Sequence, residues 1–266
     1  MNMTEIIISK LKEIEKKEDV RVLLAVESGS RAWGFASPDS DYDVRFIYVR
    51  PLSKYLQLDK QKDVIEWQLD DVLDISGWDL NKALIQFQKG NATLFEWSNS
   101  PIVYIRALEW SYIYEHAQFF FSAKASLYHY YGTAKNTFSS HLQDENVKYK
   151  KYFYALRPLL ACNYIETFGA PPPVLFNDLL ELNLPNSLRT SINELLEIKK
   201  VTNEKDLNPH IPVIHDFIKS ELAKQKEKAS SHIDDHNGNW DALNAVFQTI
   251  VYHNMTSHYP DKSMFL

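Results

Sequence analysis

The stretch ESGSRAWGFASPDSDYDVR, residues 27–45, decides the fold. It follows an apolar, β-branched run at 20–26, which predicts a buried strand that ends in a tight turn at Gly29. Glycine allows the backbone to turn sharply there and to come close to a ligand. Residues 30–35 are expected to form a short helix, and residues 42–49 a second strand. This order places a ligand-binding turn next to the start of the second strand.

Two aspartates open the second strand. Asp41 and Asp43 are two residues apart, so on a strand both carboxylates project from the same face. Mg²⁺ keeps several waters and takes one or two carboxylates together with substrate phosphate oxygens. Gly29 and Ser30 offer backbone N–H groups and a hydroxyl to those phosphates. The alternative is ordinary turn chemistry, in which an Asp-Ser-Asp run after a proline only caps and solvates the loop.

At these residues the chain resembles the nucleotidyltransferases of the DNA polymerase β superfamily, whose pattern is Gly-Ser followed, after a loop, by Asp-x-Asp. That pattern is present as Ser28-Gly29-Ser30 and Asp41-Tyr42-Asp43-Val44. The string GSRAWGFASPDSDYDVR is similar to a bacterial and phage group labelled an RNA-repair polymerase-β family, and the similarity extends to about Tyr104 through GWDLNKALIQFQKGNATLFEWSNSPIVY. The resemblance implies an α/β (α+β) fold. A polymerase-β-like mixed-sheet nucleotidyltransferase domain at 1–105 would precede an all-helical substrate- and nucleotide-binding domain at 106–266.

The superfamily also uses a third carboxylate on a later strand of the same sheet. Asp74 is the predicted residue, because the run 72–75 is a good strand that precedes a helix. Three other aspartates remain as alternatives. Asp70 and Asp71 are expected in a solvated loop, and Asp79 is expected to cap the next helix.

The resemblance implies a reaction that depends on charge. An acceptor hydroxyl attacks the α-phosphorus of a nucleoside triphosphate, pyrophosphate leaves, and two Mg²⁺ ions, or Mn²⁺ in their place, stabilise both oxygens. Asp41 and Asp43 are expected to bind both ions. Asp74 is expected to bind only the ion that activates the acceptor hydroxyl. Gly29 and Ser30 would hold the departing β and γ phosphates.

Five basic residues are candidates for contacts with the phosphates: Arg31, Arg45, Lys150, Lys151 and Arg157. The two arginines near the aspartates are equally explained as salt-bridge partners. The other three lie on one expected helix, in the part of the chain that supplies basic residues to the nucleotide in the resembled families. A solvated amphipathic face explains their charges as well.

Composition limits the class of protein. The net charge of −6 and a pI of about 5.9 argue against a protein that coats nucleic acid, whereas a particular RNA end stays allowed. Cys162 is the single cysteine, which excludes an internal disulfide and predicts a buried thiol. Residues 1–19 have the pattern of a charged helix rather than a signal peptide, and no run approaches the roughly 18 apolar residues of a membrane span. A cytoplasmic setting is expected.

The rest of the chain is expected to be helical. His232 and His236 are the closest histidine pair, and the polar residues around them favour a solvated loop over a metal site. Pro158 predicts a kink or a break in its helix. The expected helices are 80–89, 102–116, 119–142, 148–168, 177–182, 187–199, 211–228 and 240–259.

The sequence therefore predicts an enzyme that moves a nucleoside monophosphate from a nucleoside triphosphate to a hydroxyl acceptor. An RNA end, a protein side chain and a small molecule all stay open as the acceptor. The competing hypothesis is a catalytically inactive nucleotide- and metal-binding partner module, antitoxin-like in its action. A two-metal phosphohydrolase is a third hypothesis, and it needs a water-positioning base that the sequence does not reveal.

Overall fold

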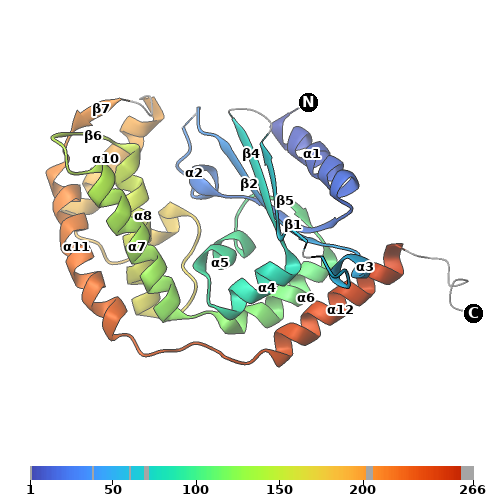
Figure 1. Cartoon of the computed structure of the whole chain (residues 1–266). Coiled ribbons are helices and arrows are strands. Elements are labelled where there is room, and N and C mark those ends of the chain that lie inside the picture. The colour runs from blue at the N-terminus through green and yellow to red at the C-terminus, as the bar shows by residue number, and fades with distance from the viewer. Residues whose placement is uncertain (1, 38, 60, 69–71, 202–205, 259–266) are drawn as a thin grey trace, which may run out of the picture.

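A five-stranded mixed sheet organises the first part of the chain (Figure 1). The computed structural model describes residues 2–37, 39–59, 61–68, 72–201 and 206–258. The strand order is β3-β4-β2-β1-β5, in which β2 and β4 run parallel and the other neighbours run antiparallel. The strands are β1 (Arg21–Glu27), β2 (Tyr42–Val49), β3 (Val64–Gln68), β4 (Leu73–Asp79) and β5 (Val103–Arg106).

Helices cover both faces of this sheet because β2 alternates between two apolar cores. Val44 and Phe46 face α1 (Met3–Glu18), while Ile47 and Val49 face α4 (Leu80–Gln88), α5 (Ala92–Ser98) and α6 (Leu108–Ala117). The last helix, α12 (Asp241–His258), returns from the far end of the molecule to this second core (Figure 1). Two single-turn helices, α2 (Gly29–Ala32) and α3 (Leu52–Tyr55), follow β1 and β2.

The second part of the chain is a helical layer with its own core, beside α2 (Figure 1). The most extensive packing within this layer is between α7 (Ala123–His141) and α8 (Lys150–Phe168). A two-stranded ribbon, β6 (Asn146–Lys148) with β7 (Leu207–Pro209), ties its loops together. The remaining elements are the 3₁₀ turn η1 (Gln118–Phe120), α9 (Phe176–Leu179), α10 (Asn186–Val201) and α11 (Pro212–Ser231).

Most sequence expectations for the elements are confirmed, but the helix expected at 102–116 is wrong, and the region expected to be all-helical also contains the short ribbon of β6 and β7. The segment 102–116 is not a single helix, because residues 103–106 form β5 at the edge of the sheet and α6 begins only at Leu108. Pairing with β1 gives this Val-Tyr-Ile-Arg run a partner that local periodicity does not reveal. Pro158 lies inside α8, which continues through it, and Cys162 is buried. In the part of the chain that the structure describes, no helix is long and apolar enough to cross a membrane.

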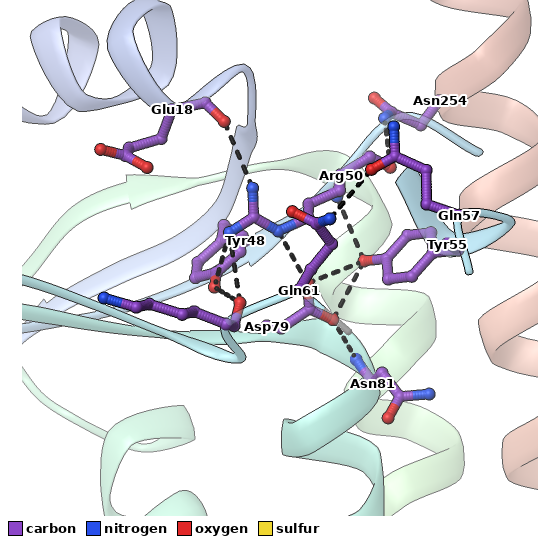
Figure 2. Close-up of polar contacts among 10 residues, drawn as sticks. Glu18, Tyr48, Arg50, Tyr55, Gln57, Gln61, Asp79, Asn81 and Asn254 are labelled. Atoms are coloured by element: carbon purple, nitrogen blue, oxygen red, sulfur yellow. Dashed lines mark hydrogen bonds and ion pairs between the residues drawn. The ribbon is translucent and has the colours of Figure 1, made fainter. Parts of the chain in front are cut away.

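A buried polar network fixes the far end of β2 and β4 (Figure 2). The Tyr55 hydroxyl donates to the Asp79 carboxylate, at 3.0 and 3.1 Å from its two oxygens, and accepts from the Arg50 backbone N–H. Arg50 Nε lies 3.7 Å from Asp79 Oδ2. Asp79 also caps α4 by accepting from the Asn81 N–H, which confirms its expected place, and Asn254 ties α12 to the Arg50 carbonyl. The network therefore joins the ends of two strands to helices α3, α4 and α12, and Arg50 also donates to the Glu18 carbonyl of α1.

Gly77 in β4 allows a test of how closely β4 packs against Phe46 of β2. A Cβ atom at Gly77 would lie 2.2 Å from the ring of Phe46, which is fully buried. We expect Gly77→Ala to lower the free energy of unfolding by about 1–3 kcal/mol. The matched control is Gly132→Ala in α7, where a Cβ meets nothing within 4 Å and the gain in helix propensity is about 0.5–1 kcal/mol. Equal urea midpoints for the two variants would contradict this packing.

Asp79 provides a pH test. Burial raises the pKa of this carboxyl from 3.8 to about 6, against the opposing effects of its hydrogen bonds and of Arg50. A raised pKa favours the protonated folded form, so the contribution of Asp79 to stability is fully present below about pH 4 and is lost as the pH rises through 6. Relative to Asp79→Asn, the wild-type free energy of unfolding should fall by about 2 kcal/mol between pH 4.5 and pH 7 in urea titrations. Parallel pH profiles for the two proteins would show that Asp79 does not titrate as expected.

Candidate functional site

The parallel pairing of β2 and β4 places Asp43 and Asp74 side by side. The two residues are register partners, and both project from the face that also carries Arg45. Asp41 lies just before β2 and is exposed. Partial burial raises the pKa of Asp43; the charge of Arg45 opposes this, and the charges of Asp74 and Asp41 add to it. Asp43 is therefore close enough to both Asp41 and Asp74 for their charges to act on it.

Arg45 is the counter-ion of this pair. Its Nη2 lies 2.8 Å from Asp74 Oδ2 and 3.2 Å from Asp43 Oδ1. The Arg45 side chain is about one-fifth exposed, whereas that of Asp74 is about half exposed. A single guanidinium thus occupies the position between the two carboxylates where a bound cation would be expected.

The Gly29–Ser30 turn packs directly on Asp43. Gly29 has a φ of +61°, and a Cβ atom there would lie 2.3 Å from Asp43 Oδ2, so only glycine fits without strain. The Ser28 N–H donates to the Asp43 carbonyl at 2.8 Å, and Ser30 is buried behind the turn. The expected turn and the expected carboxylate are therefore in contact.

Arg31 holds the loop that carries Asp41. Its Nε donates to the Asp41 carbonyl at 3.0 Å and its Nη2 to the Ser40 carbonyl at 2.5 Å. Its guanidinium also lies 3.7 Å from the ring centre of Tyr42. Arg31 therefore has a structural role, which is to hold this loop, in addition to the expected contact with phosphate.

Glu27 is a residue of this site to which sequence reasoning assigned no task. It ends β1, is 1% exposed, and accepts hydrogen bonds from the Asp43 N–H at 2.7 Å and from the Tyr104 hydroxyl at 2.5 Å. Burial raises its pKa, although both hydrogen bonds oppose the shift. In the sequence, the available signal for this role was a glutamate at the end of a largely apolar strand. Glu27 fixes the backbone from which the Asp43 side chain projects.

The basic candidates of α8 separate into two groups. Lys150 and Lys151 lie in its first turn, and Lys151 Nζ is 5.5 Å from the ring of Tyr154, which contacts Trp33 just beyond the Gly-Ser turn. Arg157 lies two turns further along and is 2% exposed. The structure does not bring Arg157 to the carboxylates.

Arg157 instead pairs with Glu96 in a buried contact between the two parts of the chain. Its Nη1 lies 2.7 Å from Glu96 Oε1, its Nε donates to the Val174 carbonyl, and its guanidinium lies 4.6 Å from the ring of Trp33. Glu96 also accepts from the Tyr130 hydroxyl at 2.8 Å and from Trp33 Nε1 at 3.4 Å. Burial alone would raise the pKa of Glu96, but Arg157 holds it below its usual value. The segment after the Gly-Ser turn is therefore anchored to the helical layer.

The other carboxylate candidates lie elsewhere. Asp79 is at the opposite end of β4 from Asp74, and Asp70 and Asp71 lie outside the described residues. Within the described ranges, no group of three His, Cys, Asp or Glu side chains has an arrangement ready to hold a metal ion. His232 and His236 are in a loop, as expected. The donors at Asp43 and Asp74 have the oxygen chemistry that Mg²⁺ prefers, but Arg45 would have to leave them first.

The Glu96–Arg157 pair can be tested by a double-mutant cycle. Removing one partner leaves a buried charge uncompensated, so Glu96→Gln and Arg157→Met should each cost about 3–5 kcal/mol of unfolding free energy in urea titrations. The double variant should cost clearly less than the sum. Glu13→Gln is the control, because its exposed pair with Lys10 is worth about 0–1 kcal/mol. Additive losses at Glu96 and Arg157 would show that the two side chains are not coupled.

Three comparisons relate the chain to known proteins. A family model described as "RNA repair pathway DNA polymerase beta family" matches residues 3–249. The protein YcgL of Bacillus subtilis (strain 168), named as uncharacterized, is 46% identical over 229 residues, which are 85% of this chain and 88% of that protein. A crystal structure of a nucleotidyltransferase-like protein from Exiguobacterium sibiricum 255-15 matches 93% of this chain and 80% of its own, at 12% identity and a TM-score of 0.29. By the family model and by the Bacillus relative, the chain belongs to the RNA repair pathway DNA polymerase beta family.

Proposed function

We propose that this protein transfers a nucleoside monophosphate from a nucleoside triphosphate to a hydroxyl acceptor and releases pyrophosphate. The observation that carries the proposal is the contact between Gly29 and the Asp43 carboxylate, with Asp74 beside it on the neighbouring strand. A turn with free backbone donors next to paired carboxylates is the arrangement that a triphosphate with its divalent cations requires. Membership of the family supports the same reaction.

The site residues would form two groups, one that binds the phosphates and one that binds the cations and serves the acceptor hydroxyl. Gly29 and Ser30 would hold the β and γ phosphates, and Lys150 and Lys151 would approach them from the helical layer. Asp41, Asp43 and Asp74 would bind Mg²⁺ or Mn²⁺, which polarises the phosphoryl oxygens and lowers the pKa of the acceptor hydroxyl when it is bound. Asp74, whose side chain is more exposed than that of Asp43, would take the proton of that hydroxyl.

Release of Asp43 and Asp74 by Arg45 would be the first step of the proposed reaction. The single positive charge of Arg45 offsets part of the repulsion between Asp43 and Asp74, because its guanidinium contacts both carboxylates. Binding of Mg²⁺ or Mn²⁺ by Asp43 and Asp74 would require Arg45 to release both carboxylates, and Arg45 would then be available to the triphosphate. A planar guanidinium suits the bidentate recognition of phosphate oxygens.

The same Arg45 pairing favours a second candidate, a nucleotide-binding partner module without catalysis. A permanent Arg45 bridge would keep Asp43 and Asp74 from binding metal, and within the described residues no group of three His, Cys, Asp or Glu side chains is arranged to hold a metal ion. In that case the protein would bind a nucleotide without transferring any part of it.

Transfer of label decides between the two candidates. The protein is incubated with α-³²P-labelled ATP, CTP, GTP or UTP, Mg²⁺ or Mn²⁺, and total cellular RNA and protein. We expect label to move onto an acceptor, pyrophosphate to be released, and Asp43→Asn to lower the rate by about 100-fold or more. Asp216→Asn, an exposed carboxylate on α11, is the matched control and should keep the full rate. Calorimetric binding of nucleoside triphosphate without transfer would support the partner module instead.

A further inference from the structure

Lys199 is a buried lysine of the helical layer to which the proposed function gives no role. It lies near the end of α10 and is 6% exposed. Its ammonium group donates a hydrogen bond to the Phe35 carbonyl, 164 residues away in the sequence. Lysine side chains usually keep this charged end in water and bury only the methylene stem. Here the charged end instead points inward, onto the backbone that leads to Asp41.

The ammonium group lies beside aromatic rings that favour its charge. Lys199 Nζ is 5.1 Å from the ring centre of Phe35 and 5.9 Å from that of Phe153 in α8. The Phe35 ring is 5% exposed and stacks on Phe153, with the centroids 4.9 Å apart. It also meets the ring of Phe176 in α9, at 5.6 Å and 88°. Three helices of the layer therefore hold Phe35, because α8 and α9 pack on its ring and α10 binds its carbonyl.

Phe35 lies between the Gly-Ser turn and Asp41 along the chain. Its N–H donates to the Ser30 carbonyl at 3.2 Å, which ties it to the turn. On the other side, the Ser40 N–H donates to the Ser37 carbonyl at 3.1 Å, and the two serine hydroxyls are 3.0 Å apart. Asp41 follows directly. A displacement of Phe35 is therefore transmitted to the turn on one side and to Asp41 on the other.

The buried ammonium group serves position better than it serves stability. Taking a charge out of water is unfavourable, and an apolar side chain of similar volume in its place is often equally stable. An apolar side chain does not provide a directional donor that fixes one carbonyl. Arg31 holds the Asp41 end of this loop through the Ser40 and Asp41 carbonyls. Lys199 supplies the corresponding contact at the Phe35 end, and it does so from the helical layer.

We propose that Lys199 is a positioning residue for the loop that carries Asp41, so that the helical layer sets the place of Asp41 relative to the carboxylates of β2 and β4. The binding of Mg²⁺ or Mn²⁺ by Asp41 rests on the proposed function. Lys199 itself contacts neither nucleotide nor cation in this assignment and acts through the Phe35 carbonyl. If the loop without this contact holds Asp41 in place for only about one-tenth of the time, the apparent affinity for the cation falls about tenfold.

Hydrogen–deuterium exchange of the full chain, without nucleotide or metal, tests the contact with the loop. In Lys199→Met the backbone amides within residues 34–41 should exchange about tenfold faster or more, because the loop opens more often. Lys199→Arg keeps a positive charge and a donor and should restore most of the protection. Equal exchange within residues 34–41 in wild type and Lys199→Met would overturn the proposal.

Two further variants support this measurement. Ile192→Val is the matched control, because it removes one buried methyl group from the same helix and leaves Lys199 and Phe35 unchanged. It should leave exchange within residues 34–41 as in wild type. Lys199→Gln, whose side chain is one bond shorter and stays polar, provides the same test should Lys199→Met fail to fold.

The Mn²⁺ dependence of label transfer tests the positioning of Asp41. Lys199→Met should raise the half-saturating Mn²⁺ concentration about tenfold, while the rate at saturating Mn²⁺ falls by less than about threefold. A merely structural role would lower the amount of active protein, and hence the rate at every Mn²⁺ concentration, without moving the midpoint. Faster loop exchange with an unchanged midpoint would therefore overturn the positioning role.

The two readouts separate this inference from the proposed function. Absence of transfer by wild type, together with loop exchange that depends on Lys199, would reject the enzyme and support the contact that holds the loop. Transfer by wild type, with loop exchange and a Mn²⁺ midpoint that do not depend on Lys199, would support the enzyme and overturn the inference.

Discussion

The parallel pairing of β2 with β4 is the constraint on which the rest of the structure depends. Its register brings Asp43 opposite Asp74 at one end and Tyr48 opposite Asp79 at the other. The pairing requires a residue without a side chain at Gly77, because the Phe46 ring fills that space. A shift of one strand by one residue would turn its carboxylate toward the opposite apolar core. The chemistry at one end is therefore secured by packing along the whole pair.

The two ends of this strand pair use buried charge differently. At the far end, Arg50 and Tyr55 enclose Asp79, and the hydrogen bonds of its carboxyl group hold strands and helices together. At the near end, Asp43 and Asp74 stay partly exposed and share a single Arg45. Two carboxylates with one counter-ion keep a net negative charge that attracts cations, whereas an enclosed pair does not. Solvent exposure thus distinguishes the structural contacts of Asp79 from the candidate functional site at Asp43 and Asp74.

Sequence patterns predicted what depends on neighbours along the chain. The first two strands, the Gly29 turn and the Asp79 cap follow from local alternation and local hydrogen bonding, and the structure contains all of them. Residues whose surroundings come from distant segments were not predictable in this way. Residues 103–106 are a strand because β1 lies beside them, and Arg157 is buried because Glu96 meets it from 61 residues away. A basic residue on a helix has the same local pattern whether it faces phosphate or a buried carboxylate.

The Glu96–Arg157 pair also limits how the site can work. Trp33 contacts both residues, and it lies four positions after Gly29. A wide opening between the sheet and the helical layer would separate this buried pair together with the Trp33 and Tyr130 contacts around it. Substrate entry and product release are therefore expected to depend on small side-chain movements. Arg45 is the side chain best placed for them, since its partners at the site are the same carboxylates that the substrate's cations must reach.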